Sequence, residues 1–253
     1  MQKLITFLLA TAVSLPVLAQ ETGRTDDGFK KNHVKINLFA LPLRNFSFQY
    51  ERGLNEDMSV ALGASFLPKG SIPFQGTIRN AIDAEEGDAG LDLVNNAKVS
   101  SWSLTPEFRY YFGKKPLNGF YLAPFVRIGA YNIDWQYKYE KSDGSERPVD
   151  LKGRSGTFSA GLLIGAQWHL GERILLDWWI LGPQYGSNNI KLEASGDFSD
   201  LTKAEQADLE SIIEKISYNG NRFDATVTDN SVRADNKISL PGLRTGFCIG
   251  FKF

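Results

Sequence analysis

The sequence predicts an all-β fold, an eight-stranded antiparallel up-and-down transmembrane β-barrel with one short helix in the last extracellular loop. Three observations predict it: an export signal at the N-terminus, eight segments in which apolar and polar residues alternate, and connections that are short and long in turn. Strict alternation is typical of a strand whose two faces meet different surroundings. A membrane chain without apolar helices must cross as a closed sheet, because every backbone polar group needs a partner in lipid.

The N-terminus has the three parts of a secretory signal. Lys3 is positively charged, Leu4–Leu15 is apolar and uncharged, and small residues end at Ala19. The apolar stretch is short for a spanning helix, and no run of about 20 apolar residues follows it. A buried N-terminal helix is the less favoured alternative. We expect three parts: a signal peptide at 1–19, a periplasmic N-terminal tail at 20–32 and the outer-membrane β-barrel at 33–253.

Alternation of apolar and polar residues defines the strands. It is clearest at the end of the chain, where odd positions from Leu243 to Phe253 are apolar or threonine and even positions hold Arg244, Cys248, Lys252 and glycines. A soluble half-buried strand alternates in the same way, so one segment alone does not indicate a barrel, but seven further segments repeat the pattern. The eight expected strands are 34–40, 45–51, 58–66, 101–112, 120–129, 157–168, 174–180 and 242–253.

The connections favour a barrel over a soluble sandwich. Short turns at 53–57, 113–118 and 171–173 alternate with long polar segments, and only the outer connection at Pro42 and Leu43 is nearly absent. Short periplasmic turns and long extracellular loops are typical of outer-membrane barrels. An even number of strands puts both termini on the periplasmic side. The expected extracellular loops are 68–98, 140–153 and 182–241.

Parity also constrains the pairing of strands. A turn centred near Asn55 places Glu51 opposite Ser59, polar facing polar, and a one-residue slip would invert every side chain. Pro106 and Pro124 lie on the apolar faces of neighbouring strands, where a closed sheet offers them no free edge. We therefore expect a bulge or a local break in the ladder beside these prolines.

One helix is expected inside the last long loop, from Thr202 to Lys215. Thr202 and Glu205 have the spacing of a capping box, which satisfies free N–H groups at a helix start. The apolar residues that follow share one face of the helix. A helix folded over the barrel mouth is the favoured interpretation, and a partner-binding helix is the alternative. The apolar face consists of Leu209, Ile212, Ile213 and Ile216.

Eight charged residues are expected on the inward faces of the strands. Both signs are present, and Glu107 is diagonal to Arg127 across one hairpin. An eight-stranded barrel has an interior just wide enough for side chains, and buried charges must pair or incur a large desolvation cost. A salt-bridged polar core is therefore favoured over a charged pore or an active site. The expected interior network consists of Lys35, Glu51, Glu107, Arg109, Arg127, Asp177, Arg244 and Lys252.

Catalytic, metal and nucleic-acid signals are weak. The chain has two histidines, His33 and His169, and both are expected at the periplasmic end, away from outer-leaflet lipids. No nucleophile elbow, metalloprotease motif, phosphate loop or zinc spacing occurs. The net charge of −1 argues against nucleic acid as principal partner, and Cys248 alone forms no internal disulfide. We expect no cofactor and no metal.

The sequence contains several distinctive motifs: Phe46–Arg52, Ser59–Gly63, Phe66–Lys69, Thr105–Arg109, Gly119–Pro124, Gly165–Trp168, Leu176–Pro183, the acidic helix after Leu201 and Gly242–Phe253. Together these motifs resemble a family of small outer-membrane barrels from Bacteroides-type bacteria, described as a domain of unknown function. The resemblance covers nearly all of the mature chain and implies the architecture without an activity. More distantly, the chain is similar to the OmpA and OmpX barrels, and we expect no C-terminal peptidoglycan-binding domain, because the last expected strand reaches residue 253. Phe251 and Phe253 resemble the signal by which such barrels are recognised for assembly.

Two functional hypotheses follow. The first is a non-enzymatic outer-membrane protein whose surface loops bind a partner or maintain the envelope. The second is a lipid-modifying enzyme of the acyltransferase or deacylase type. A channel is a third hypothesis, limited by the width of the interior. The expected partners are outer-membrane lipid and lipopolysaccharide, the barrel-assembly machinery and an extracellular ligand that the sequence does not identify. We expect a monomer that binds no nucleic acid.

Overall fold

The computed structural model describes most of the chain after residue 29. The expected signal peptide at 1–19 and residues 20–29 of the expected tail lie outside the described residues. No side-chain surroundings are described for 137–148. The described residues are 30–81, 94–140, 146–196, 198–199, 202–204, 206–207, 210, 217–218, 221–222 and 224–253.

Strands dominate the described residues, and the helical elements are short. Four strands are much longer than the others and contain 22 to 25 residues each. In chain order the elements are β1 (Asn32–Asn37), the 3-10 helix η2 (Leu38–Leu43), β2 (Phe46–Gly53), β3 (Met58–Ser71), α2 (Gln75–Ala81), β4 (Lys98–Tyr111), β5 (Gly119–Glu140), β6 (Glu146–Leu170), β7 (Ile174–Ser195), β8 (Ser217–Tyr218), β9 (Asn221–Arg222), β10 (Asp224–Val227) and β11 (Ser231–Lys252).

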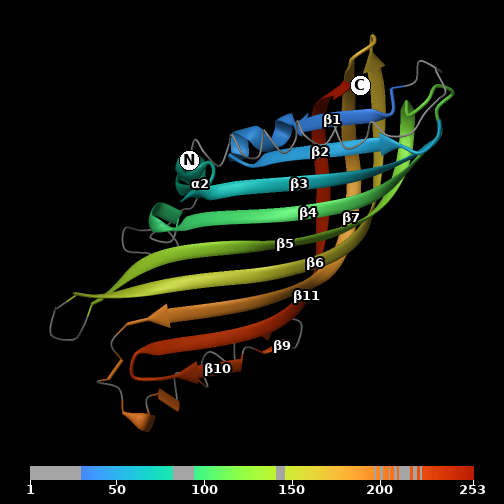
Figure 1. Cartoon of the computed structure of the whole chain (residues 1–253). Coiled ribbons are helices and arrows are strands. Elements are labelled where there is room, and N and C mark those ends of the chain that lie inside the picture. Colours follow the sequence, from blue (N-terminus) through green and yellow to red (C-terminus); the bar gives the residue numbers. More distant parts are fainter. Residues whose placement is uncertain are drawn as a thin grey trace.

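Consecutive strands pair antiparallel and close into a ring of hydrogen bonds (Figure 1). The ring runs from β1 through β7 to β11, which pairs back with β1. The sheet nevertheless contains nine strands, one more than expected, because β10 adds to β11 outside the ring. A separate two-stranded sheet, β8–β9, lies between β7 and β10 in the sequence.

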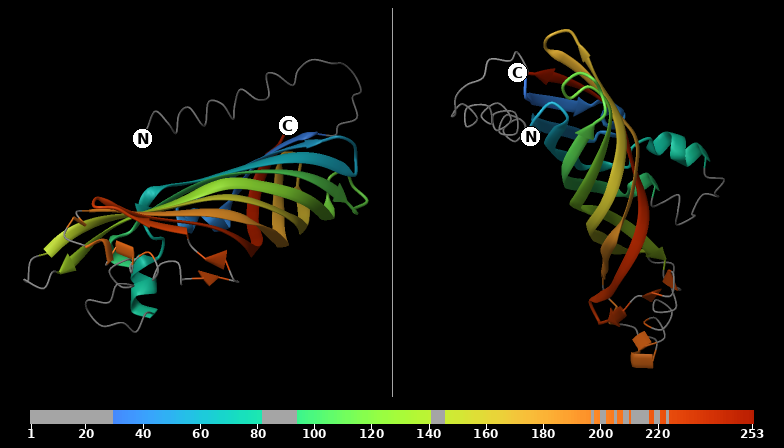
Figure 2. Two further views of the ribbon diagram at one scale, coloured as in Figure 1. Left: turned by 90° about the horizontal axis from the view of Figure 1, so that it is seen from below. Right: turned by 90° about the vertical axis from the view of Figure 1, so that its right-hand side faces the viewer.

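The two ends of the ring differ. At one end, here called the turn end, lie the short connections after β2, β4 and β6 and the last residues of β11. At the opposite far end, β5, β6, β7 and β11 run on beyond the short strands (Figure 2). The segment between β3 and β4 also lies at the far end and includes α2.

The ring closes unevenly. β1 pairs with β11 only from His33 to Asn37, opposite Cys248–Lys252. Further along β11, β10 pairs with residues 232–235. Between these two pairings, residues 237–247 of β11 have a described strand partner only on the β7 side. This unpaired edge, beside η2 and the start of β2, is called the seam below.

The strands extend well past their expected ends. β5 and β6 take up the expected loop at 140–153 except for residues 141–145, which lie outside the described residues, and the expected loop at 182–241 loses residues to β7, β10 and β11. A register shift in both ladders of β7 occurs next to Ile180. The exposed positions of β7 change there from even numbers to odd numbers. A β-bulge inverts the faces of a strand in this way, so the single parity used for the prediction failed beyond residue 180.

The first strand is shorter than expected and ends at Asn37 rather than Ala40. The side chain of Asn37 accepts a hydrogen bond from the backbone N–H of Phe39 and begins η2. Pro42 has no N–H to donate to a ladder, which favours leaving the sheet here. Arg44, in the left-handed conformation at φ 57°, ends the 3-10 helix. The connection expected to be nearly absent is therefore a 3-10 turn.

The first long hairpin has a register two residues away from the expected one. Glu51 lies opposite Ala61 instead of Ser59. The turn occupies residues 54–57, where the side-chain oxygen of Asn55 accepts two backbone N–H groups at 2.8 and 2.9 Å, a common way for Asn to stabilise a turn. A two-residue shift preserves the faces of both strands, so the inward and outward assignments stand.

The ladder between β4 and β5 is interrupted beside the two prolines. Leu104 pairs with Ile128 and Tyr110 with Leu122, but around Pro106 and Pro124 only one pair joins the strands. The register is the same on both sides of the interruption. This agrees with the expected local break, which follows from the absence of an N–H on each proline.

The two faces of the ring have opposite polarity to those of a soluble protein. The outward face is apolar along the strands near the turn end, and the buried inward face is rich in polar and charged side chains. Exposed large apolar side chains occupy 102–110 in β4, 120–128 in β5, 158–170 in β6, 174–185 in β7 and 243–251 in β11.

Toward the far end the outward face becomes polar. In β11, Arg233, Asp235 and Lys237 are exposed, while Ala234 and Ile238 on the inward face are buried. The long strands thus have an apolar exterior in one half and a polar exterior in the other. The expected helix begins as predicted, since described positions from 203 to 210 are helical, but Glu205 and its apolar face lie outside the described residues. Within the described residues, no helix is both long and apolar enough to span a membrane.

Candidate functional site

Six charged side chains from five strands meet inside the ring, near the turn end. They carry three positive and three negative charges, and their side chains are at most 5% exposed. The inward faces of the strands position them, as parity predicts. This interior cluster consists of Lys35 of β1, Glu51 of β2, Glu107 and Arg109 of β4, Asp177 of β7 and Arg244 of β11.

Lys35 joins two carboxylates across the ring. Its Nζ lies 2.5 Å from Glu51 Oε2 and 2.6 Å from Asp177 Oδ2. It also donates to the side-chain oxygen of Gln167 at 2.5 Å. An ammonium group has three protons to donate, and here each has an oxygen partner.

Arg109 is the centre of the interior cluster. Its guanidinium lies 2.6 Å from Glu107, 2.7 Å from Asp177 and 3.4 Å from Glu51. It also donates to Gln49 at 2.7 Å. The planar guanidinium supplies five N–H donors in fixed directions, so one arginine binds groups from β2, β4 and β7 together.

Arg244 connects Glu107 with the aromatic side chains above it. Its Nη1 lies 2.5 Å from Glu107 Oε2. The guanidinium carbon lies 4.1 Å from the centre of the Trp179 ring and 5.1 Å from that of Phe125. A desolvated cation over an aromatic face is attracted by the ring electrons, which helps to stabilise its buried charge.

Uncharged polar side chains complete the cluster, and the sequence analysis did not single them out. Tyr111 donates to Glu51 at 2.6 Å and Tyr121 donates to Asp177 at 2.7 Å. Gln49 donates to Glu107. All three occupy inward positions by parity, which is the signal that could have located them, whereas the predicted network contained charged residues alone.

Glycines leave room for these side chains. A Cβ atom at Gly165 would lie 2.3 Å from the hydroxyl oxygen of Tyr121, and one at Gly250 would lie 2.8 Å from the side chain of Lys35. Either methyl would displace a member of the cluster. Glycines at these inward positions therefore leave the space that the large side chains of the cluster occupy.

The turn between β4 and β5 closes the ring beneath the cluster. Leu117 is fully buried and packs with Tyr111, Tyr121 and Leu163. Its backbone N–H donates to Glu56 and its carbonyl accepts from Gln167. At this end the interior is thus filled by the interior cluster, whose three positive and three negative charges balance, and by a layer of apolar side chains around Leu117.

Two of the eight expected network residues lie elsewhere. Arg127 sits diagonal to Glu107 as expected, but its Nη2 donates to Ser103 at 3.0 Å, and none of the ion pairs among the described residues includes it. Glu107 is instead occupied by Arg109 and Arg244, which reach it from closer positions. Lys252 lies below the cluster and donates to the carbonyl of Gly171 at 3.1 Å.

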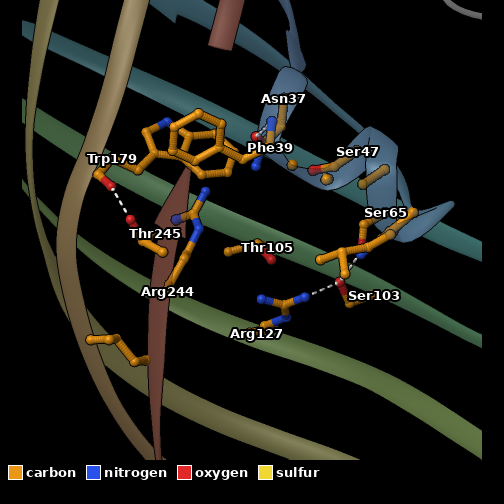
Figure 3. A pocket seen from close by; sticks show the side chains of 16 residues that line it. Asn37, Phe39, Ser47, Ser65, Ser103, Thr105, Arg127, Trp179, Arg244 and Thr245 are labelled. Carbon is orange, nitrogen blue, oxygen red and sulfur yellow. Dashed lines mark hydrogen bonds between the residues drawn. The ribbon is translucent and has the colours of Figure 1, made fainter. Parts of the chain in front are cut away.

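A cavity of about 330 Å³ lies immediately above Arg244 (Figure 3). Arg127 and Arg244 both point into it, and the hydroxyl groups of Ser47, Ser65 and Ser103 face them. A second cavity of about 170 Å³ continues toward the far end on the other side of Arg127. The interior is therefore filled at the turn end and hollow at the level of these arginines.

The lining of the larger cavity restricts its chemistry. Its sixteen residues include three serines but no histidine, aspartate, glutamate or cysteine. A serine nucleophile needs a neighbouring base. The two histidines lie together at the turn end, with ring centres 5.7 Å apart. No group of three metal-ligating side chains occurs within the described part of the chain.

A family model described as "Protein of unknown function (DUF3575)" matches residues 5–188. The chain belongs to the DUF3575 family. No curated protein and no solved structure matches the chain. The family description agrees with the expected domain of unknown function and names no location, ligand or reaction.

The DUF3575 match covers most of the site. It includes β1 to β6 and the first part of β7, and therefore five of the six residues of the interior cluster. Arg244 and the seam edge of β11 follow the matched region. The cluster thus combines the part of the chain that resembles the DUF3575 family with the strand that closes the ring.

Proposed function

We propose that the chain is a non-enzymatic outer-membrane β-barrel whose closed half anchors it in the bilayer and whose far end presents a binding surface. The observation that carries the proposal is the inverted polarity of the ring. Fully buried Lys35, Arg109 and Asp177 lie inside, while an apolar belt faces outward. In water this arrangement would expose a large apolar surface. In a bilayer the apolar belt would contact lipid, while the charged side chains stay inside the ring.

The dimensions of the belt support a membrane location. Its exposed apolar stretches are nine to thirteen residues long in β4, β5, β6, β7 and β11. A transmembrane β-strand needs about 9–11 residues. The four long strands, at about 3.3 Å per residue, extend roughly 70–80 Å and therefore reach beyond the bilayer.

Exposed aromatic side chains border the belt on both sides. Neighbouring members of each girdle lie on paired or nearly paired strand positions, so each girdle follows the ring at one level. Aromatic girdles at both interfaces are a property of outer-membrane barrels. The girdle at the turn end is Tyr110, Phe112, Phe120, Trp168 and Phe251, and the girdle toward the far end is Phe46, Phe66, Trp102, Phe158 and Tyr185.

The non-enzymatic role is supported by the site itself. The charged residues of the interior cluster are engaged with one another, and the cavity above them has no side chain suited to act as a general base. The polar far end, formed by the extensions of β5, β6, β7 and β11 with β10, is the surface available for partners. The helical positions near 206 are attached to it, since Gln206 donates to Asp229 at 2.9 Å.

The test compares a charge on the apolar belt with a charge on the polar half. We expect Leu162→Arg, in the middle of the belt on β6, to lower the free energy of unfolding in lipid vesicles by about 2–4 kcal/mol. Ser239→Arg, exposed on the polar half of β11, should change it by less than about 0.5 kcal/mol. The measurement is urea unfolding after reconstitution, with heat-modifiability on gels as proof of insertion. Equal effects of the two substitutions would contradict the membrane proposal.

A further inference from the structure

The larger cavity connects the interior of the ring with its exterior. Its lining includes inward-facing Arg244 together with Leu243 and Thr245, which project from the opposite face of β11. Phe39, Leu43 and Leu243 line the cavity and are exposed, so the cavity reaches the outer surface beside the free edge of β11. The free edge is the seam, where residues 237–247 of β11 have no described strand partner on the β1 side.

The exterior mouth of this cavity is apolar. Phe39 and Leu243 line the cavity and are 59% and 61% exposed, respectively. Leu43 of η2 adds a further exposed apolar side chain beside them. The interior part is polar and positively charged, with Arg127 and Arg244 directed into it (Figure 3). The cavity is thus amphipathic from inside to outside.

The cationic character of the interior part is not neutralised by the cavity wall. Arg244 has Glu107 on its lower side, but none of the described residues that line the cavity is acidic. Among the described residues, the hydrogen-bond partner of Arg127 is the Ser103 hydroxyl, and no described ion pair includes Arg127. Guanidinium groups beside hydroxyl donors match the geometry of carboxylate and phosphate oxygens.

The height of the cavity indicates where its ligand would come from. Ser65 and Ser103 line the cavity one residue away from Phe66 and Trp102, which belong to the aromatic girdle toward the far end. Such a girdle marks the level of lipid head groups at an interface. The seam therefore opens sideways at the depth where the head group of a lipid ends and its chains begin.

We propose that this cavity binds an amphiphile with an oxyanion head group, which enters through the seam. The phosphate or carboxylate oxygens bind Arg127 and Arg244, and the hydrocarbon chain leaves between η2 and β11 past Phe39 and Leu243. A cavity of about 330 Å³ is at the lower end of the range for small-molecule sites, which suits a head group rather than a whole lipid. This inference rests on the proposed membrane location.

The test uses dodecyl phosphate as the probe, measured by native mass spectrometry on inserted, heat-modifiable protein in a neutral maltoside detergent. We expect one dodecyl phosphate to bind each chain. Arg127→Gln should weaken binding at least tenfold, and Ser65→Trp, which fills the cavity without removing charge, should do the same. Arg154→Gln is the matched control. It removes the same charge, but Arg154 is exposed on the outer face of β6 and lies outside the cavity.

Two further probes separate head group from chain. Inorganic phosphate should bind at least tenfold more weakly than dodecyl phosphate. The binding of uncharged dodecanol should be the same in Arg127→Gln as in the unchanged protein. The inference is overturned if Arg127→Gln binds dodecyl phosphate as tightly as the unchanged protein, or if inorganic phosphate binds equally well. Loss of heat-modifiability in the unchanged protein would instead contradict the proposed function, so the two failures are distinguishable.

Discussion

At the scale of single residues, the interior cluster has a balance that its burial requires. Three cations and three carboxylates lie within hydrogen-bonding reach of one another, and Tyr111, Tyr121, Gln49 and Gln167 satisfy further oxygens and protons. Desolvating an ion costs several kcal/mol, which only such dense pairing offsets. The cluster therefore depends on each of its members.

The first prediction concerns Asp177, whose carboxylate accepts hydrogen bonds from Lys35, Arg109 and Tyr121 at 2.6 to 2.7 Å. Asp177→Asn should lower the free energy of unfolding by about 3–5 kcal/mol, because it leaves buried cations without their counter-charge. Glu193→Gln is the control, since Glu193 pairs with Arg233 in an exposed position and should cost at most about 1 kcal/mol. Urea unfolding in vesicles, followed by tryptophan emission, measures both. A cost for Asp177→Asn as small as that of the control would show that the cluster does not hold the ring together.

Parity predicted which charged residues face inward but not which of them meet. Lys35 and Asp177 are 142 residues apart and meet only because the ring brings β1 and β7 to facing positions. Arg127 has the same parity as Arg109 but lies two positions further from the turn end than its expected partner Glu107, and so reaches the cavity instead. The height of a residue along its strand depends on the register of every hairpin. This height decides whether an inward charged side chain lies in the interior cluster or in the cavity.

At the scale of elements, the predicted strands were located correctly near the turn end and cut short toward the far end. There the outward residues change from apolar to polar, so the pattern resembles a polar loop although the backbone remains in the sheet. In β7 the bulge at Ile180 also exchanges the two faces. Neither change alters strand propensity strongly. Alternation with apolar residues always on the same set of odd or even positions therefore stops being recognisable where the exterior becomes polar and where the bulge exchanges the faces.

β11 is the element on which closure depends. It pairs with β7 along nearly its whole length and with β1 through five residue pairs. Deleting Gly250 to Phe253 removes three of those five pairs and leaves backbone groups of β1 without partners, each costing roughly several kcal/mol in lipid. We therefore predict that this deletion abolishes membrane insertion.

The control for this deletion is the replacement of residues 200–216 by a short glycine–serine linker. It removes no residue of the ring, so insertion should be retained. Heat-modifiability and membrane fractionation of both variants provide the measurement. Insertion of the chain that lacks 250–253 would mean that the β1–β11 pairing is not needed to close the ring.

At the scale of the whole molecule, two environments are visible along one sheet. Near the turn end the ring is apolar outside and charged inside, whereas toward the far end β11 exposes Arg233, Asp235 and Lys237 and buries Ala234 and Ile238. The first arrangement suits lipid and the second suits water. The boundary between them coincides with an aromatic girdle and with the cavity at the seam, which is why the cavity is a candidate for a ligand that has both characters.

The last prediction concerns permeability. Eight strands enclose an interior that side chains can fill, and here the interior cluster spans it while Leu117 closes the turn end. A hydrated ion would have to break several buried ion pairs to pass, whereas the cavity above ends at Arg244 and opens sideways. We therefore predict no stable current of porin size across planar bilayers that contain the protein. The double variant Arg109→Ser with Glu107→Ser, which removes a cation and a carboxylate together, serves to verify that the assay detects an opened interior. Reproducible large currents from the unchanged protein would mean that the cluster does not close the ring.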